Sequence, residues 1–332
     1  MSASDVQTDV ASRLVGRGSI SDAHRALAGV AERTPLLHAH WLSEEVGAQV
    51  RLKCENLQRA GAFKIRGAYT AIARLEEGQR ARGVIAYSSG NHAQGVALAA
   101  RLFGIRAVVV MPTTAPAVKR EGARRLGAEV VLEGTTSIER QQRAESIAAE
   151  QGLTVVPAFD HPDIIAGQGT TAMEILEDWP DVEVILVPIG GGGLISGMAA
   201  YVKQTRPEIR VIGVEPVTAD AMRQSLAAGE PVTIPPARTV ADGLMPVRPG
   251  DLTFLHAREY VDDIVLVDDD AILHATRRLL GDSRLIVEFS GAATVAALLS
   301  RAFDPHGSQV AAVLSGGNLD PRRALELLDM RD

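Results

Sequence analysis

One lysine in this sequence stands where its side chain could act as a nucleophile. Lys64 follows the glycine-containing turn 60–62, and Ile65, Ala68 and Ile72 then recur at helical spacing. This pattern predicts a helix with a buried apolar face that begins at the lysine. Loss of hydration disfavours the ammonium form, so the amine can attack a carbonyl carbon near neutral pH. A lone lysine at a helix start is more often a solvated side chain, so the interpretation depends on other segments.

Three segments rich in glycine or polar residues each follow a predicted strand, namely 87–95, 190–193 and 315–318. Without side chains, the backbone amides of the glycine run 190–193 can approach a phosphate, and the helix that follows adds partial positive charge. The hydroxyl of Ser315 could meet a ring nitrogen. An amine that traps an aldehyde, a phosphate-binding turn and a polar group for a heterocycle together describe a site for pyridoxal 5'-phosphate (PLP).

With these segments, the chain resembles the fold-type II PLP-dependent enzymes, specifically the threonine/serine dehydratase and serine racemase family. The resemblance runs from about residue 33 to the end of the sequence. The motifs on which the resemblance rests are, in order, ENLQRAGAFKIRGA at 55–68, SSGNHAQGVA at 88–97, IAGQGT at 165–170, PIGGGGL at 188–194, GVEP at 213–216, ADG at 241–243 and LSGGN at 314–318. The glycine run alone would be a weak signal, but all the motifs in this order are specific.

The predicted elements alternate between strand and helix in two blocks, which indicates parallel βαβ units. The first block has strands at 84–87, 107–111, 129–132 and 154–156 and helices at 91–103, 115–126 and 137–151; the second has strands at 184–189, 211–215, 264–267 and 310–314. The motif SISD at 19–22 predicts the cap of a helix that extends to Val30.

The resemblance implies an α/β fold of the tryptophan synthase β type. Two open, twisted, parallel-sheet domains hold the cofactor in the cleft between them. We expect residues 1–82 and 159–332 to form the large PLP-binding domain and residues 83–158 the small domain.

The resemblance also implies the residues that hold PLP. Lys64 is expected to bond to the aldehyde carbon of the cofactor, with Phe63 beside it, and Asn91 to bond the phenolic oxygen. Ser315, next to Gly316, is expected to face the pyridine nitrogen. The phosphate is assigned to the backbone amides of Gly190, Gly191, Gly192, Gly193 and Leu194.

Two catalytic residues are expected by resemblance. Lys64, once released, removes the Cα proton of the substrate, and Ser89 lies on the opposite face of the cofactor, where a serine reprotonates Cα in serine racemase. Ser89 could instead bond the substrate carboxylate or cap the following helix.

Donors to the substrate carboxylate are expected from the loop that contains Ser89 and from one arginine. They are Ser88, Ser89, Gly90, His92 and Arg140. Taken alone, His92 would more often be a structural histidine, and Arg140 is one of several arginines on a solvated helix face.

A divalent cation is a weaker expectation. Some relatives bind one through a glutamate, a carbonyl four residues on and an aspartate six residues on, and these positions are Glu215, Ala219 and Ala221 here. Loss of the last carboxylate should weaken binding of a hard cation. We therefore expect a weak or water-completed site at most.

The composition excludes several classes of protein. The 332 residues carry a net charge of −7 without a basic patch, so nucleic acid is not an expected partner. No stretch has the length and apolar character of a membrane span or a signal peptide. The single cysteine, Cys54, fits a reducing compartment, so we expect a cytoplasmic protein. The resemblance implies a homodimer or higher homo-oligomer.

The predicted function is that of a PLP-dependent ammonia-lyase. It would eliminate water from L-threonine or L-serine and release a 2-oxo acid and ammonia. The alternatives are a serine racemase with dehydratase side activity, or a dehydratase of threo-3-hydroxyaspartate or another β-hydroxy amino acid; a non-catalytic PLP- or amino-acid-binding protein is a further hypothesis. Because the chain ends one predicted helix after LSGGN, no regulatory domain of the long biosynthetic threonine dehydratases is expected.

Overall fold

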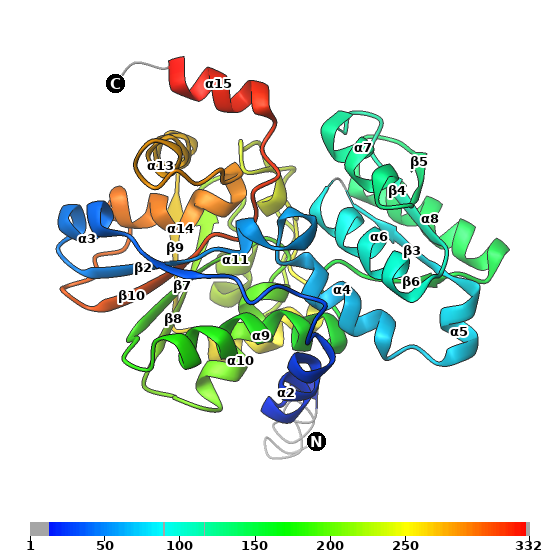
Figure 1. Ribbon diagram of the computed structural model, residues 1–332, viewed down its shortest axis with the longest axis horizontal. Helices are drawn as coiled ribbons and strands as arrows, with labels where there is room; N and C mark the ends of the chain where they lie inside the picture. The colour runs from blue at the N-terminus through cyan, green and yellow to red at the C-terminus, as the bar shows by residue number, and fades with distance from the viewer. Residues whose placement is uncertain (1–12, 89, 116, 330–332) are drawn as a thin grey trace.

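The computed structural model describes residues 13–88, 90–115 and 117–329 (Figure 1). Within the described residues, the strands form two separate sheets, one of six strands and one of four. The catalytic Ser89 expected from the sequence lies outside the described residues.

The larger sheet has the strand order β1-β2-β10-β7-β8-β9. Only β1 is antiparallel to its neighbour among the described strands, and the other pairs are parallel. Its strands are β1 (Leu36–His38), β2 (Gln49–Lys53), β7 (Val184–Pro188), β8 (Arg210–Pro216), β9 (Asp263–Val267) and β10 (Gln309–Val313). Because helices bury both faces, the central strands are continuous apolar runs.

Helices pack on both faces of this sheet and form two core clusters. One face carries α3 (His40–Val46), α13 (Asp269–Asp282) and α14 (Phe289–Leu299). The other carries α2 (Arg17–Ala26), α9 (Pro162–Asp178), α10 (Gly193–Lys203) and α12 (Asp251–Tyr260). Helix α11 (Ala221–Ala228) packs beside α12 and adds Met222 to the second cluster, and α15 (Pro321–Asp329) contacts α13.

The smaller sheet has the order β5-β4-β3-β6, and all its described pairs are parallel. Its strands are β3 (Val84–Tyr87), β4 (Ala107–Met111), β5 (Glu129–Leu132) and β6 (Thr154–Val155), and its helices are α6 (Asn91–Phe103), α7 (Ala117–Arg125) and α8 (Ser137–Gln151). A short helix, α5 (Glu77–Arg82), precedes β3. All four strands fall inside the range 83–158, and the domain limits themselves remain a proposal.

Helix α4 (Lys64–Ala73) lies between the two sheets (Figure 1). It begins at Lys64, as the apolar spacing predicts. Its buried residues Ile65, Ala68 and Ile72 belong to the core cluster of the smaller sheet, while the helix also contacts α9 beneath the larger sheet. The helix that carries the lysine is therefore fixed by both halves of the molecule.

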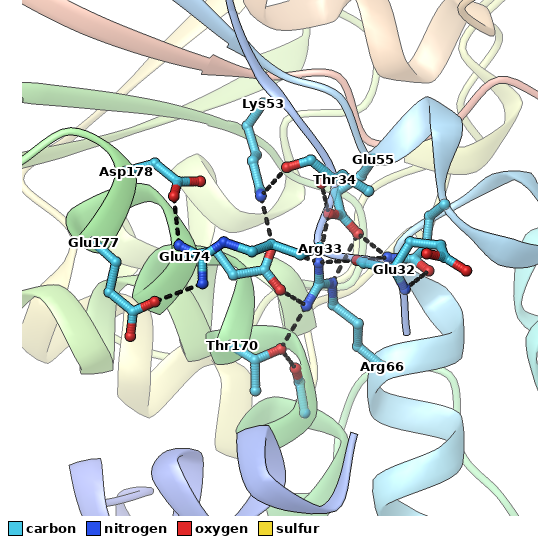
Figure 2. Close-up of polar contacts among 12 residues, drawn as sticks. Glu32, Arg33, Thr34, Lys53, Glu55, Arg66, Thr170, Glu174, Glu177 and Asp178 are labelled. Carbon is cyan, nitrogen blue, oxygen red and sulfur yellow. Dashed lines mark hydrogen bonds and ion pairs between the residues drawn. The ribbon is translucent and has the colours of Figure 1, made fainter. Parts of the chain in front are cut away.

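A buried network of four charges anchors α4 (Figure 2). The guanidinium of Arg66 donates to both oxygens of Glu55, at 2.8 and 2.8 Å, and to both oxygens of Glu174, at 2.6 and 2.9 Å. The ammonium of Lys53 donates to Glu174 at 2.5 Å and to the Thr34 carbonyl oxygen at 2.7 Å. Two cations and two anions balance, so the network links α4 to β2 and α9 without net buried charge.

Both predicted limits of the first helix are wrong. The first described helix begins at Arg17 rather than at the SISD motif, and it ends at Ala26 rather than Val30. Its N-cap is Gly16, which has no side chain that could cap the helix. Burial of Ile20 and Ala23 against the core determines the helix position more strongly than the local capping residues do.

Among the described residues, no helix is both long enough and apolar enough to cross a membrane.

Candidate active site

Lys64 lies immediately after a turn in left-handed backbone conformations. Ala60 has φ 60° and Gly61 has φ 72°, and a Cβ on Gly61 would lie 2.4 Å from Oδ1 of Asn318, so only glycine fits there. The Lys64 ammonium donates to the Ala158 carbonyl oxygen at 2.8 Å. Burial lowers the pKa of Lys64 to about 8, against the opposing charge of Glu288. The side chain of Lys64 is half-buried, and its lowered pKa has the direction expected for an amine that has lost part of its hydration.

The glycine run forms a side-chain-free turn at the start of α10. A Cβ on Gly191 would lie 2.2 Å from the ring of Phe159, and one on Gly193 would lie 3.0 Å from the Phe159 Cα. Gly192 has φ 95°, and the Gly191 carbonyl oxygen accepts a hydrogen bond from Thr253 Oγ1 at 2.7 Å. Phe159 follows Ala158, the partner of Lys64, so one short segment joins the lysine to the glycine turn. Leu194 is buried in the core behind the turn.

Asn91 and the segment after β10 meet beside the Lys64 turn. Phe63 N–H donates to the Ser315 carbonyl oxygen at 3.2 Å, and Ala62 forms a β-bridge with Gly316. A Cβ on Gly316 would lie 3.1 Å from Asn91 Nδ2. Ser315 is buried. Residues from three distant parts of the chain that were expected to hold the cofactor therefore converge at the carboxyl ends of β3 and β10.

The loop from β3 to α6 places three of the expected carboxylate donors. Gly90 N–H donates to Ser88 Oγ at 3.2 Å, and Gly90 precedes the first residue of α6. His92 is buried, and its Nε2 is 2.9 Å from the Val156 carbonyl oxygen. Burial and the charge of Lys64 lower the pKa of His92 to about 3, so the ring stays neutral. A neutral ring bonded to the backbone fits a structural role for this side chain, and only the His92 N–H at the helix start remains as a donor for substrate.

Arg140 and Glu215 make local contacts. Arg140 lies in the first turn of α8, where Nη1 donates to the Thr135 carbonyl oxygen at 3.4 Å. The two Glu215 oxygens accept hydrogen bonds from Met222 and Arg223 N–H, at 2.9 and 2.9 Å, and so cap α11. Burial raises the pKa of Glu215 to about 8.

Among the described residues, no cluster of metal-binding side chains completes the cation site expected at Glu215 and Ala219. Ala219 N–H donates to the Pro216 carbonyl oxygen at 2.9 Å. Across the described ranges, no group of three or more His, Cys, Asp or Glu side chains could hold a metal ion. The substrate role of Arg140 and the metal role of Glu215 and Ala219 remain predictions.

Two residues that the sequence did not single out, Glu288 and Lys119, also reach this site. Glu288 accepts a hydrogen bond from Asn91, and Lys119 of α7 pairs with Asp242 in the short helix Asp242–Leu244. The Lys119 Nζ lies 3.2 Å from the point that a Cβ on Gly90 would occupy. Nothing in the local sequence marks Glu288 or Lys119, which α14 and α7 bring to the site, whereas Asp242 belongs to the ADG motif.

Comparison with known proteins identifies the family of the chain. The pyridoxal-phosphate dependent enzyme family matches residues 27–316. The chain belongs to this family. It is 48% identical over 301 residues to the L-threonine ammonia-lyase of Thermotoga maritima, which covers 91% of this chain and 75% of the relative. The L-threo-3-hydroxyaspartate ammonia-lyase of a Pseudomonas species is 42% identical, covering 91% of this chain and 95% of the relative.

Among solved structures, maize serine racemase matches with a TM-score of 0.91 and 39% identity, covering 95% of this chain and 97% of that chain. The family match and this likeness confirm the fold class, the PLP dependence and the enzymatic nature expected from the sequence.

The residues of the site fit PLP. The amine of Lys64 has a lowered pKa, as bonding to an aldehyde requires. The turn at Gly191 and Gly193 is bare backbone at a helix start, which suits a phosphate. Asn91 supplies an amide and Ser315 a buried hydroxyl for the ring.

Alanine at Gly191 is expected to weaken PLP binding at least about tenfold. The added methyl group cannot fit 2.2 Å from the Phe159 ring, so the phosphate-binding turn must shift. The dissociation constant of PLP, measured by fluorescence titration, checks this. Gly281→Ala is the matched control, because a Cβ there meets nothing within 4 Å; equal PLP affinity in both variants would contradict the assignment.

Proposed function

We propose that this protein is a PLP-dependent ammonia-lyase that converts L-threonine or L-serine to a 2-oxo acid and ammonia. The proposal is carried by the surroundings of the Lys64 amine. Its pKa is lowered to about 8, and the glycine turn, Asn91 and Ser315 lie around it. The 48% identity to an L-threonine ammonia-lyase supports L-threonine as the first substrate to test.

Each part of the site has a distinct role in this proposal. The backbone amides of the glycine turn hold the phosphate, and Asn91 and Ser315 orient the ring. The first N–H groups of α6, from Asn91 onward, have no carbonyl partner within the helix and point toward an anion at its N-terminus. We assign the substrate carboxylate to this end of α6, together with Ser88, Gly90 and Ser89.

Lys64 is the proton acceptor in this proposal. Its amine takes the Cα proton of the substrate, because burial keeps a large share of it neutral near pH 8. When bound, the cofactor supplies an electron sink for the pair left on Cα. The β-hydroxyl group then leaves as water, taking the proton that Lys64 has accepted, and gives an enamine. The enamine tautomerises to an imine and hydrolyses in solution to the 2-oxo acid and ammonia.

A serine racemase is the second candidate function. It is favoured by Ser89 in the sequence, on the face of the cofactor opposite Lys64 by resemblance, and by the likeness to maize serine racemase. Racemisation requires a proton donor to Cα on that face, whereas elimination of water does not.

The deciding experiment measures ammonia and 2-oxo acid release by the purified protein with added PLP. The substrates are L-threonine, L-serine, D-serine and L-threo-3-hydroxyaspartate, with Lys64→Ala as the control. We expect L-threonine to give the highest kcat/KM, and release to disappear in the control. No release from any substrate would refute the ammonia-lyase, and chiral analysis of the same L-serine samples would then separate a racemase from a binding protein.

Location and assembly are also proposals. A cytoplasmic location is supported by the single, buried Cys54, whose pKa burial raises to about 12, so it is an unreactive thiol. Homodimer formation is supported by the family resemblance, and light scattering of the purified protein would test it. The proposed limits of the small domain, 83–158, can be tested by limited proteolysis.

A further inference from the structure

The side-chain amide of Asn91 is held from both ends. Its Nδ2 donates to Glu288 Oε1, and its Oδ1 accepts a hydrogen bond from Asn318 Nδ2 at 2.9 Å. A carboxylate accepts and an NH₂ group donates, so rotation of the Asn91 amide by half a turn would break both bonds. An amide nitrogen carries two hydrogens, and the bond to Glu288 uses one of them.

Both partners of Asn91 are themselves fixed. Asn318 Nδ2 also donates to the Ala60 carbonyl oxygen at 2.9 Å, and Asn318 Oδ1 lies 2.4 Å from the point that a Cβ on Gly61 would occupy. Glu288 N–H donates to the Gly316 carbonyl oxygen at 3.0 Å, and a Cβ on Gly316 would lie 2.3 Å from Glu288 Oε1. The two glycines thus make room for the two polar side chains that hold Asn91.

The second oxygen of Glu288 is buried. Within the described residues, Oε2 has no hydrogen-bond partner. Charged groups from three other elements face the carboxyl group: Lys64 of α4, Lys119 of α7 and Asp242. Burial raises the pKa of Glu288 to about 7, with Asp242 acting in the same direction and both lysines opposing. A buried carboxyl oxygen without a hydrogen-bond partner lowers the stability of the fold. Its presence therefore indicates that Glu288 has a role beyond packing.

We propose that Glu288 and Asn318 are positioning residues of the active site, which lock the Asn91 amide so that its second Nδ2 hydrogen points at the ring oxygen of the cofactor. This inference rests on the proposed role of Asn91 in PLP binding, but not on which amino acid the enzyme converts. Glu288 acts through Asn91 and makes no bond to substrate.

A double-mutant cycle on PLP binding tests the proposal without any substrate. In the otherwise unchanged protein, Glu288→Ala and Asn318→Ala should each raise the dissociation constant of PLP roughly tenfold, because Asn91 loses its orientation. In the Asn91→Ala background, the same substitutions should change it less than about twofold. Equal effects in both backgrounds would show that Glu288 and Asn318 act independently of Asn91 and would overturn the proposal.

The conservative variant Glu288→Gln separates orientation from charge. Its side-chain oxygen can still accept from Asn91, so PLP affinity should stay within about twofold of the original protein. The visible absorption spectrum of bound PLP should change with pH near 7 in the original protein, where Glu288 titrates, and this change should be absent in Glu288→Gln. The proposed role of Glu288 would be refuted if Glu288→Gln bound PLP as weakly as Glu288→Ala does. It would also be refuted if the absorption spectrum of PLP bound to Glu288→Gln kept the pH dependence of the original protein. If Glu288→Ala does not fold, as judged by circular dichroism, the cycle with Asn318→Ala still distinguishes the two outcomes.

Discussion

Replacement of Lys64 by alanine is expected to reduce turnover of every amino-acid substrate at least about a thousandfold. The variant loses both the group that bonds to PLP and the base that takes the Cα proton, and a positioned base alone contributes about 10²–10⁴-fold. Ammonia release under saturating PLP measures the loss. Thermal unfolding should remain close to that of the original protein, because the Lys64 ammonium makes one bond to a carbonyl oxygen.

The pH dependence of cofactor capture reports the state of the same amine. Only the neutral amine bonds to the aldehyde, and the Lys64 pKa of about 8 lies below that of an ordinary lysine because burial disfavours the charged form. Covalent capture of PLP by cofactor-free protein should therefore accelerate about tenfold per pH unit below 8 and level off above it. Borohydride trapping followed by mass spectrometry gives the rate. A rate that keeps rising to about pH 10 would identify an ordinary, hydrated lysine instead.

The sequence predicts the strands well and the helices unevenly, for a physical reason. The strands of the smaller sheet are short apolar runs between clear turns, and β3, β4 and β5 have the predicted limits. Helix α14 gives only a weak signal in the sequence, because residues from Ser290 to Leu298 are all buried and the helix shows no alternation of polar and apolar faces. Burial on every side removes the periodic signal on which sequence reading depends.

The candidate site was predictable where a motif carries the chemistry within a few residues. Asn91, the glycine run and Ser315 each follow a predicted strand, and parallel strands bring their carboxyl ends together. Glu288 and Lys119 lie in segments without such a motif, and only the packing of α7 and α14 brings them to Gly90 and Asn91. Sequence spacing cannot reveal a contact between residues about 200 positions apart, such as Asn91 and Glu288.

Replacement of Arg66 by methionine is expected to lower the free energy of unfolding by about 3–5 kcal/mol. Arg66 is 1% exposed, and its removal leaves the buried carboxylates of Glu55 and Glu174 with Lys53 as their remaining cation (Figure 2). Burial alone would raise the pKa of Glu55, yet the charge and hydrogen bonds of Arg66 hold it below its ordinary value. Urea unfolding followed by circular dichroism measures the loss.

Two further variants show whether buried charge is the cause. Arg33→Met breaks ion pairs to Glu177 and Asp178, but the Arg33 side chain is 48% exposed, so the loss should stay below about 1 kcal/mol. Adding Glu174→Gln to Arg66→Met removes one of the two carboxylates that share Lys53 and should restore part of the lost stability, because the charge of Lys53 then balances that of Glu55. A double variant less stable than Arg66→Met would show instead that the hydrogen bonds of Glu174, rather than the balance of buried charge, hold the Lys64 helix between the two sheets.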